Sequence, residues 1–142
     1  MKKEKRIIKS LKRILFDAHA ILKWTQKERG YQWVKALMIE CLDQKALGYM
    51  NQINLGEVYY RTIRVIGLEE AKKFLENFFR LPIFIILPDS ELIWKASGIK
   101  AEYSISYADC FAAATALQHG AAILTGDPEF KKIESLVSID WI

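Results

Sequence analysis

Short apolar runs alternate with longer helical patterns along this chain, and this alternation limits the possible folds more than any other feature. The strand-like runs are residues 14–16, 46–50, 83–87, 121–124 and 137–141. Helical patterns cover residues 31–43, 53–66, 68–80, about 90–102 and 106–119, and a short helix is expected to end near 135. Strands that alternate with helices predict parallel pairing, with helices on both faces of the sheet. We therefore predict a three-layer α/β domain with a central parallel sheet of about five strands.

The size and composition of the chain fit one globular domain. Its 142 residues are 51% hydrophobic and 27% charged, which excludes a disordered or collagen-like chain. Cys41 and Cys110 lie far apart and match no zinc-binding spacing, so free thiols are expected. No apolar run approaches the roughly 18 residues of a membrane span. We expect a cytoplasmic protein that does not associate with membranes.

The positive charge of the chain is concentrated at its beginning. The net charge is +4, but residues 1–13 hold seven basic residues and one acidic residue, so the remainder is slightly acidic. We therefore predict a basic N-terminal arm, residues 1–11, and a folded domain, residues 12–142. The arm could attract nucleic acid or an acidic partner, or it could be a solvated end that aids solubility.

Four acidic residues stand where strands end or helices begin: Asp17, Glu57, Asp109 and Asp127. Taken singly, each is readily explained by attraction to a helix N-terminus, for roughly 0.3–1 kcal/mol, and Glu57 could also pair with Arg61. Parallel topology, however, can bring all four to one edge of the sheet, where α/β proteins place their functional sites.

Such a convergence of acids requires compensation. Two unit charges about 5 Å apart repel by about 3 kcal/mol at an effective dielectric of 20. Bound cations are the usual remedy, and an all-oxygen site suits Mg²⁺ or Mn²⁺ rather than zinc. A site of this kind activates water and stabilises charge on a phosphodiester.

Four segments carry a resemblance to a known family, in order along the chain: ILFDAHAIL (14–22), INLGEVYY (53–60), SYADCFAAA (106–114) and LTGDPEF (124–130). With these segments the chain resembles a PIN-domain ribonuclease, and within that family a VapC-like toxin of a type II toxin–antitoxin pair. The resemblance implies a PIN-like fold, a Mg²⁺- or Mn²⁺-dependent endoribonuclease acting on RNA, a homodimer and a small antitoxin partner. It assigns Asp17, Glu57, Asp109 and Asp127 to the catalytic, metal-binding site. Thr125 matches a position where a hydroxyl residue often supports that site.

Some residues depart from this pattern or leave alternatives open. His19 stands where many family members have Ser, Thr or Asn, and it is either a metal-facing ring or a hydrogen-bonded surface residue. Phe74, Phe78 and Phe79 form an apolar stripe that could pack in the core or mark a dimer or antitoxin surface, and the four tryptophans are expected to pack. Two other functions stay open: a PIN nuclease in RNA maturation, and an inactive α/β module whose acids merely cap helices.

Overall fold

The five strands form one fully parallel sheet in the computed structural model, which describes residues 2–5 and 11–142. The spatial order is β3-β2-β1-β4-β5. The strands are β1 (Lys12–Phe16), β2 (Ala46–Asn51), β3 (Ile83–Ile86), β4 (Ala122–Thr125) and β5 (Ile139–Trp141). At the centre, Ile14 of β1 lies opposite Gly48 of β2 on one side and Ala122 of β4 on the other. The strand order therefore reverses direction at β1, which opens a crevice at the carboxyl ends of β1 and β4.

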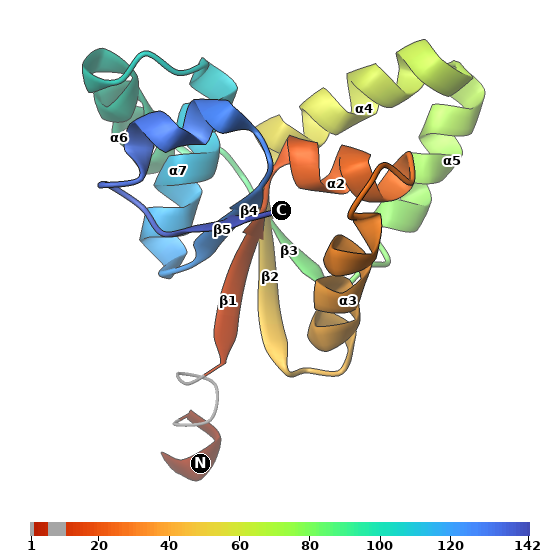
Figure 1. Cartoon of the computed structure of the whole chain (residues 1–142), viewed down its shortest axis with the longest axis horizontal. Coiled ribbons are helices and arrows are strands. Elements are labelled where there is room, and N and C mark those ends of the chain that lie inside the picture. The colour runs from red at the N-terminus through yellow and green to blue at the C-terminus, as the bar shows by residue number, and fades with distance from the viewer. Residues whose placement is uncertain (1, 6–10) are drawn as a thin grey trace.

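Helices cover both faces of this sheet (Figure 1). One face carries α2 (Ala18–Thr25), α3 (Tyr31–Leu42), α4 (Gln52–Ile66) and α5 (Leu68–Phe78). The other carries α6 (Ser90–Glu102), α7 (Tyr107–His119) and the 3₁₀ helix η1 (Pro128–Ile133). Alternate residues of β1 serve the two layers: Ile14 and Phe16 pack in one core cluster and Leu15 in the other. The predicted three-layer α/β architecture is confirmed.

The structure adds one helix to the predicted elements, divides the aromatic stripe, and contradicts the expectation that the tryptophans pack. Helix α2 was not predicted, because its apolar pattern is short and follows directly on β1. The aromatic stripe is divided between the interior and the surface: Phe78 is buried in the core, Phe74 is half-buried and Phe79 is exposed. The tryptophans were expected to pack, yet Trp94 is 71% exposed.

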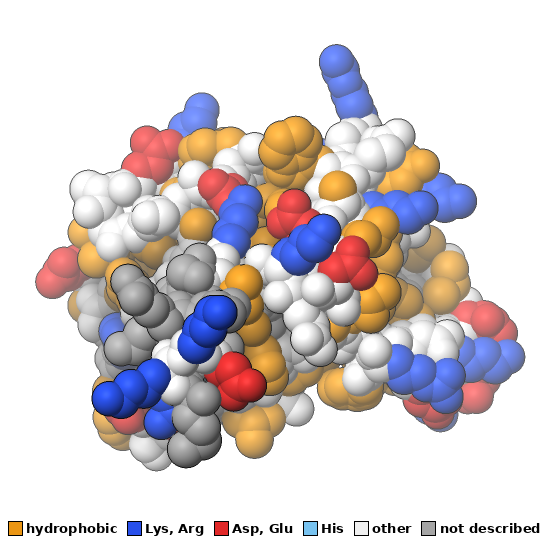
Figure 2. Space-filling view, turned by 90° about the horizontal axis from the view of Figure 1, so that it is seen from below, with side chains coloured by type: hydrophobic (Ala, Val, Ile, Leu, Met, Phe, Trp, Pro, Cys, Tyr) orange, Lys and Arg blue, Asp and Glu red, His pale blue; other side chains and the backbone are white. Residues whose placement is uncertain are grey.

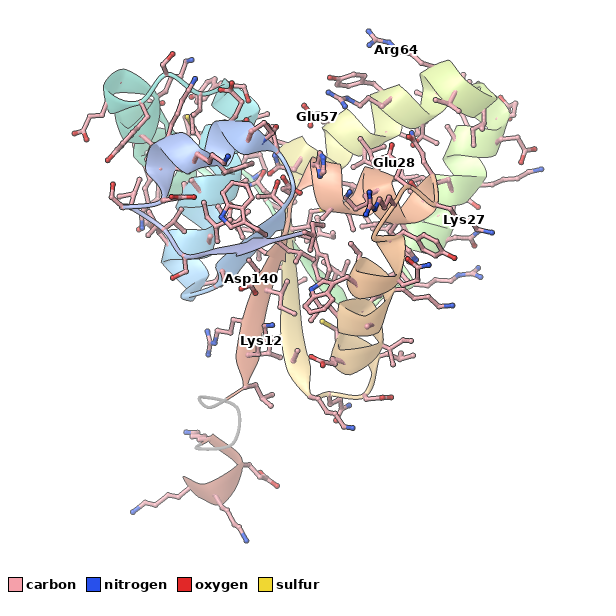
Figure 3. The ribbon with its side chains drawn as sticks, viewed as in Figure 1. Lys12, Lys27, Glu28, Glu57, Arg64 and Asp140 are labelled. Atoms are coloured by element: carbon pink, nitrogen blue, oxygen red, sulfur yellow. The ribbon has the colours of Figure 1, made fainter. Side chains whose placement is uncertain are left out.

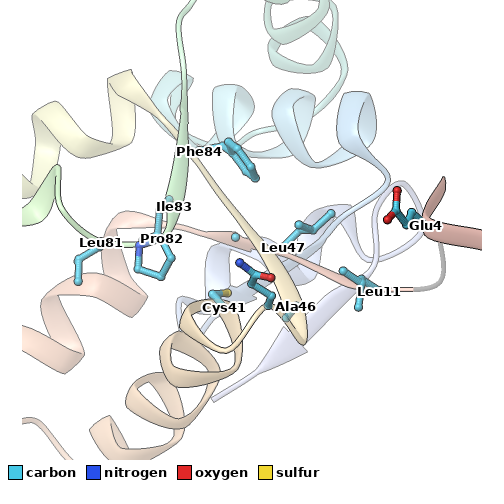
Figure 4. A pocket seen from close by; sticks show the side chains of 11 residues that line it. Glu4, Leu11, Cys41, Ala46, Leu47, Leu81, Pro82, Ile83 and Phe84 are labelled. Atoms are coloured by element: carbon cyan, nitrogen blue, oxygen red, sulfur yellow. The ribbon is translucent and has the colours of Figure 1, made fainter. Parts of the chain in front are cut away.

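A cavity of about 720 Å³ lies at the amino ends of the strands (Figure 4). It lies between the body and the helical turn at residues 2–5, and its lining is largely apolar, with Leu11, Cys41 and Phe84 among the lining residues. On this underside basic and acidic side chains are interspersed with apolar ones (Figure 2). The cavity lies at the opposite end of the strands from all four candidate acids, and we assign no chemistry to it.

Three smaller expectations concern the termini, the thiols and membranes. Part of the predicted arm, residues 1 and 6–10, lies outside the described residues, so its boundary stays a prediction. Cys41 and Cys110 are buried and free, as expected. Among the helices of residues 2–5 and 11–142, none has the length and apolar character needed to cross a membrane.

Candidate active site

Two of the candidate acids follow the central strands. Asp17 comes directly after β1, is 3% exposed, and caps α2 by accepting a hydrogen bond from the Ala20 N–H at 2.7 Å. Asp127 comes two residues after β4 and caps η1, accepting from the Glu129 N–H at 3.0 Å. Because β1 and β4 are paired in parallel, both carboxylates lie at the same edge of the sheet.

The other two acids come from helices that flank this edge. Glu57 lies in the second turn of α4, which begins where β2 ends, and Asp109 lies in the first turn of α7. The cap of α7 is Ser106, whose hydroxyl accepts the Asp109 N–H at 3.2 Å. Side-chain capping therefore accounts for Asp17 and Asp127. Asp109 lies in the first turn, where a helix N-terminus attracts a carboxylate, and neither effect accounts for Glu57.

All four predicted acids line one cavity of about 280 Å³, which answers the question of whether they converge. Figure 3 marks Glu57 on α4, beyond the carboxyl ends of the strands, with Arg64 farther along the same helix. The remaining lining residues are Ala18, His19, Arg61, Ser106 and Glu129. The lining thus includes five carboxyl groups and one guanidinium. Glu129 is the acid that the sequence analysis missed, although it lies two residues after Asp127 in the same segment.

Burial makes this cavity a costly place for negative charge. Desolvation raises the pKa of Asp17 to about 7, although hydrogen bonds from Thr125 and the Ala20 N–H oppose the shift. Desolvation also raises the pKa of Asp109 to about 6, with further contributions from Asp127 and Glu57. These directions are those expected for carboxylates that are poorly solvated and repel one another.

Hydrogen bonds hold the loop between β4 and η1 in place. The fully buried Thr125 hydroxyl accepts the Asp127 N–H at 3.0 Å. Thr125 therefore holds the backbone at Asp127, in addition to its hydrogen bond to the Asp17 side chain. The Gly126 N–H donates to Nδ1 of His19 at 3.2 Å. Burial lowers the pKa of His19.

Two buried amides connect β2 and α4 to α7. The side chain of Asn51 donates to the Thr115 hydroxyl at 3.0 Å, and that of Asn54 donates to the Ala108 carbonyl at 3.0 Å. Both asparagines are at most 1% exposed. They join the element that carries Glu57 to the helix that carries Asp109. The link through Asn54 is not among the sequence-based predictions, although a polar residue on the apolar face of a helix is a usable signal for it.

The residues of the cavity fit a hard divalent cation in their chemistry. Carboxylate oxygens are the ligands that Mg²⁺ and Mn²⁺ prefer. Desolvation and neighbouring carboxylates raise the pKa of Asp17 and of Asp109, and a bound cation would favour the ionised form of both groups. Over residues 2–5 and 11–142, no three His, Cys, Asp or Glu side chains lie close enough together to form a preformed metal-binding group. The four acids therefore share a cavity without forming a closed coordination shell.

A family model for the PIN domain matches residues 14–136, most of the chain. The chain belongs to the PIN-domain family. This family consists of nucleases, and its members generally use divalent metal ions. The match spans all four acids of the cavity and confirms the family resemblance found in the sequence.

Solved structures agree with this PIN-domain fold. VapBC2 from Rickettsia felis, bound to a DNA fragment from its promoter, is similar at 17% identity and a TM-score of 0.70, covering 92% of this chain and 99% of that one. VapC20 from Mycobacterium tuberculosis, a Sarcin-Ricin loop cleaving toxin, is similar at 15% identity and a TM-score of 0.70, covering 91% and 99%. FitAcB from Neisseria gonorrhoeae is similar at 23% identity and a TM-score of 0.64, covering 89% and 95%. No curated protein sequence matches the chain significantly.

Proposed function

We propose that this PIN domain is a divalent-metal-dependent endoribonuclease and that Asp17, Glu57, Asp109 and Asp127 form its catalytic, metal-binding site. The observation that carries the proposal is that these acids, which arise from four separate segments, line one cavity at the carboxyl edge of the sheet. Side-chain capping accounts for only two of them. Burial and neighbouring carboxylates raise the pKa of Asp17 and of Asp109, and such shifts are concentrated at functional sites.

The chemistry follows from the residues that line the cavity. A bound Mg²⁺ or Mn²⁺ would lower the pKa of water and stabilise the charge of a phosphodiester during displacement. The four carboxylates would hold the cation through oxygen atoms, and Thr125 would support them through its hydrogen bond to the Asp127 amide. The Arg61 guanidinium lines the same cavity and can donate hydrogen bonds to a phosphate oxygen of the substrate.

The biological setting is part of the proposal. Similar structures are described as VapBC, as a toxin–antitoxin complex from Klebsiella pneumoniae and as a Sarcin-Ricin loop cleaving toxin. We propose by analogy that this chain is the toxin of a type II pair, cleaves RNA in the cytoplasm, forms a homodimer and is neutralised by a small antitoxin. A small open reading frame beside the gene, whose product binds this chain and stops cleavage, would separate a toxin from a nuclease of RNA maturation.

The nuclease proposal is tested with a structured RNA and purified protein. Cleavage should require Mn²⁺ or Mg²⁺, stop in EDTA, and be lost in Glu57→Gln. The matched control is Glu76→Gln, which removes an exposed carboxylate from α5, away from the cavity. If the wild-type chain neither binds Mn²⁺ nor cleaves RNA, the inactive partner-binding module becomes the better interpretation.

A further inference from the structure

His19 contacts the loop that carries Asp127. It is the second residue of α2, and Asp17 is the cap of that helix. Its Nδ1 atom accepts a hydrogen bond from the Gly126 N–H at 3.2 Å. An amide N–H can only donate, so Nδ1 carries the lone pair and is already engaged. This hydrogen bond joins the helix capped by one candidate acid to the loop that carries another.

Gly126 is shaped to this contact. A Cβ atom at this position would lie 2.7 Å from Cε1 of His19 and 2.7 Å from the carbonyl oxygen of Ile142, closer than real Cβ atoms approach their neighbours. Gly126 is not among the glycines with positive φ, so close approach rather than an unusual backbone conformation requires glycine here. The imidazole ring and the loop therefore fit together only because residue 126 has no side chain.

Three consecutive residues of this loop are held by hydrogen bonds from different directions. The Thr125 carbonyl accepts the Ile142 N–H at 3.0 Å, the Gly126 N–H donates to His19, and the Asp127 N–H donates to the Thr125 hydroxyl at 3.0 Å. The first of these bonds joins β4 to the last residue of the chain, and the third lies between β4 and the loop that follows it. The bond to His19 instead relates the loop to α2.

We propose that His19 is a positioning residue, which sets the place of the Asp127 carboxylate relative to Asp17 by holding the Gly126 amide. This inference rests on the proposed function in so far as both acids are taken as metal ligands. His19 acts here as a hydrogen-bond acceptor and is not a ligand through Nδ1. Outer contacts of this kind commonly change metal affinity by about 10–100-fold.

The test uses two nearly isosteric substitutions. Asn places an acceptor oxygen as many bonds from the backbone as Nδ1 of histidine, whereas Leu places a methyl group there. His19→Leu should therefore weaken Mn²⁺ binding by about tenfold, measured by titration calorimetry without RNA, and His19→Asn should stay near wild type. His119→Leu is the matched control, because His119 is the other histidine of the chain and lies at the far end of α7.

A second measurement does not depend on metal. In EDTA, hydrogen exchange of the Gly126 amide, followed by NMR, should be about fivefold faster in His19→Leu than in wild type and restored in His19→Asn. Equal Gly126 exchange in wild type and His19→Leu would overturn the role of His19, as would unchanged Mn²⁺ affinity in that variant. A wild-type protein without Mn²⁺ affinity would instead refute the proposed metal site, and amide exchange alone would then decide whether His19 holds the loop.

Discussion

Replacing Asp109 with Asn separates the effect of the acidic cavity on folding stability from its proposed role in RNA cleavage. The substitution keeps the shape of the side chain and removes one negative charge from a cavity with five carboxylates. We expect Asp109→Asn to lose RNA cleavage but to melt at a higher temperature than wild type in EDTA. The same charge that opposes folding without metal would hold a cation when metal is present, so the variant should gain less stability from Mn²⁺.

The size of the effect follows from the pKa of Asp109. An increase from 3.8 to about 6 corresponds to about 3 kcal/mol at a pH above 6, at 1.36 kcal/mol per unit. Asp109 is only partly buried, so screening by solvent reduces this to about 1–2 kcal/mol. The lost attraction between a carboxylate and the N-terminus of α7 removes several tenths more. A net gain of about 1 kcal/mol raises the melting temperature by about 3 °C for a chain of this length.

The pH dependence has a defined sign. A carboxyl group whose pKa is raised in the folded protein destabilises that protein once it must ionise. The penalty is absent below about pH 3.8, grows as the pH rises to about 6, and is complete above it. The melting advantage of Asp109→Asn should therefore be largest near pH 7.5 and disappear near pH 4.

Differential scanning calorimetry in EDTA and in Mn²⁺, from pH 4 to pH 7.5, measures all of these quantities. The matched control is Asp43→Asn, an exposed residue at the end of α3, which should shift the melting temperature by less than about 2 °C. The electrostatic reasoning is refuted if Asp109→Asn melts below wild type in EDTA at pH 7.5, or if its advantage persists unchanged at pH 4. RNA cleavage at the wild-type rate would refute the assignment of Asp109 to the site.

Three further predictions follow from the same structure. Removing residues 1–11 should leave the circular dichroism spectrum unchanged and lower the melting temperature by only a few degrees, because the described arm residues that line a cavity, Glu4 and Leu11, line the apolar one. Loss of the folded spectrum would contradict the predicted domain boundary. Phe79→Glu should convert the proposed dimer to a folded monomer in light scattering, since Phe79 is 57% exposed, whereas the same change at Phe78 should unfold the protein. Mn²⁺ affinity should rise between pH 5 and pH 8, because carboxyl groups with pKa values of about 6 and 7 must lose their protons to bind a cation; calorimetric titrations that give a flat profile would contradict this.

The fold was predictable because it depends on a pattern repeated along the chain. Each apolar run predicted as a strand became one, with boundaries displaced by at most two residues, since burial on both faces requires such runs wherever the sheet lies. Helix α2 was missed because two turns give too few apolar repeats to distinguish a helix from a loop. The exposure of Trp94 was equally unpredictable, because the identity of an apolar residue does not say which side of its helix faces a neighbour.

The candidate site was predictable to the extent that topology determines it. Parallel strands place their carboxyl ends at one edge, so Asp17 and Asp127 could be brought together from their sequence positions alone. The contact between His19 and Gly126 could not, because it joins residues more than a hundred positions apart through a side chain whose direction depends on helix packing. The link from Asn54 to the Ala108 carbonyl has the same origin, since it requires α4 to lie against α7.

Capping and metal binding are compatible roles for the same acids. The backbone N–H of Ala20 occupies Oδ1 of Asp17, and the N–H of Glu129 occupies Oδ1 of Asp127. An ionised carboxylate offers about four lone-pair sites, so one backbone donor leaves it able to accept a cation. Each backbone donor also fixes the rotation of its carboxylate and so decides where the remaining lone pairs point. The capping hydrogen bonds of Asp17 and Asp127 therefore orient the two carboxylates that line the cavity. Replacing either aspartate with asparagine would keep an oxygen for the cap and remove the negative charge, so a loss of metal binding in that variant would separate metal binding from capping.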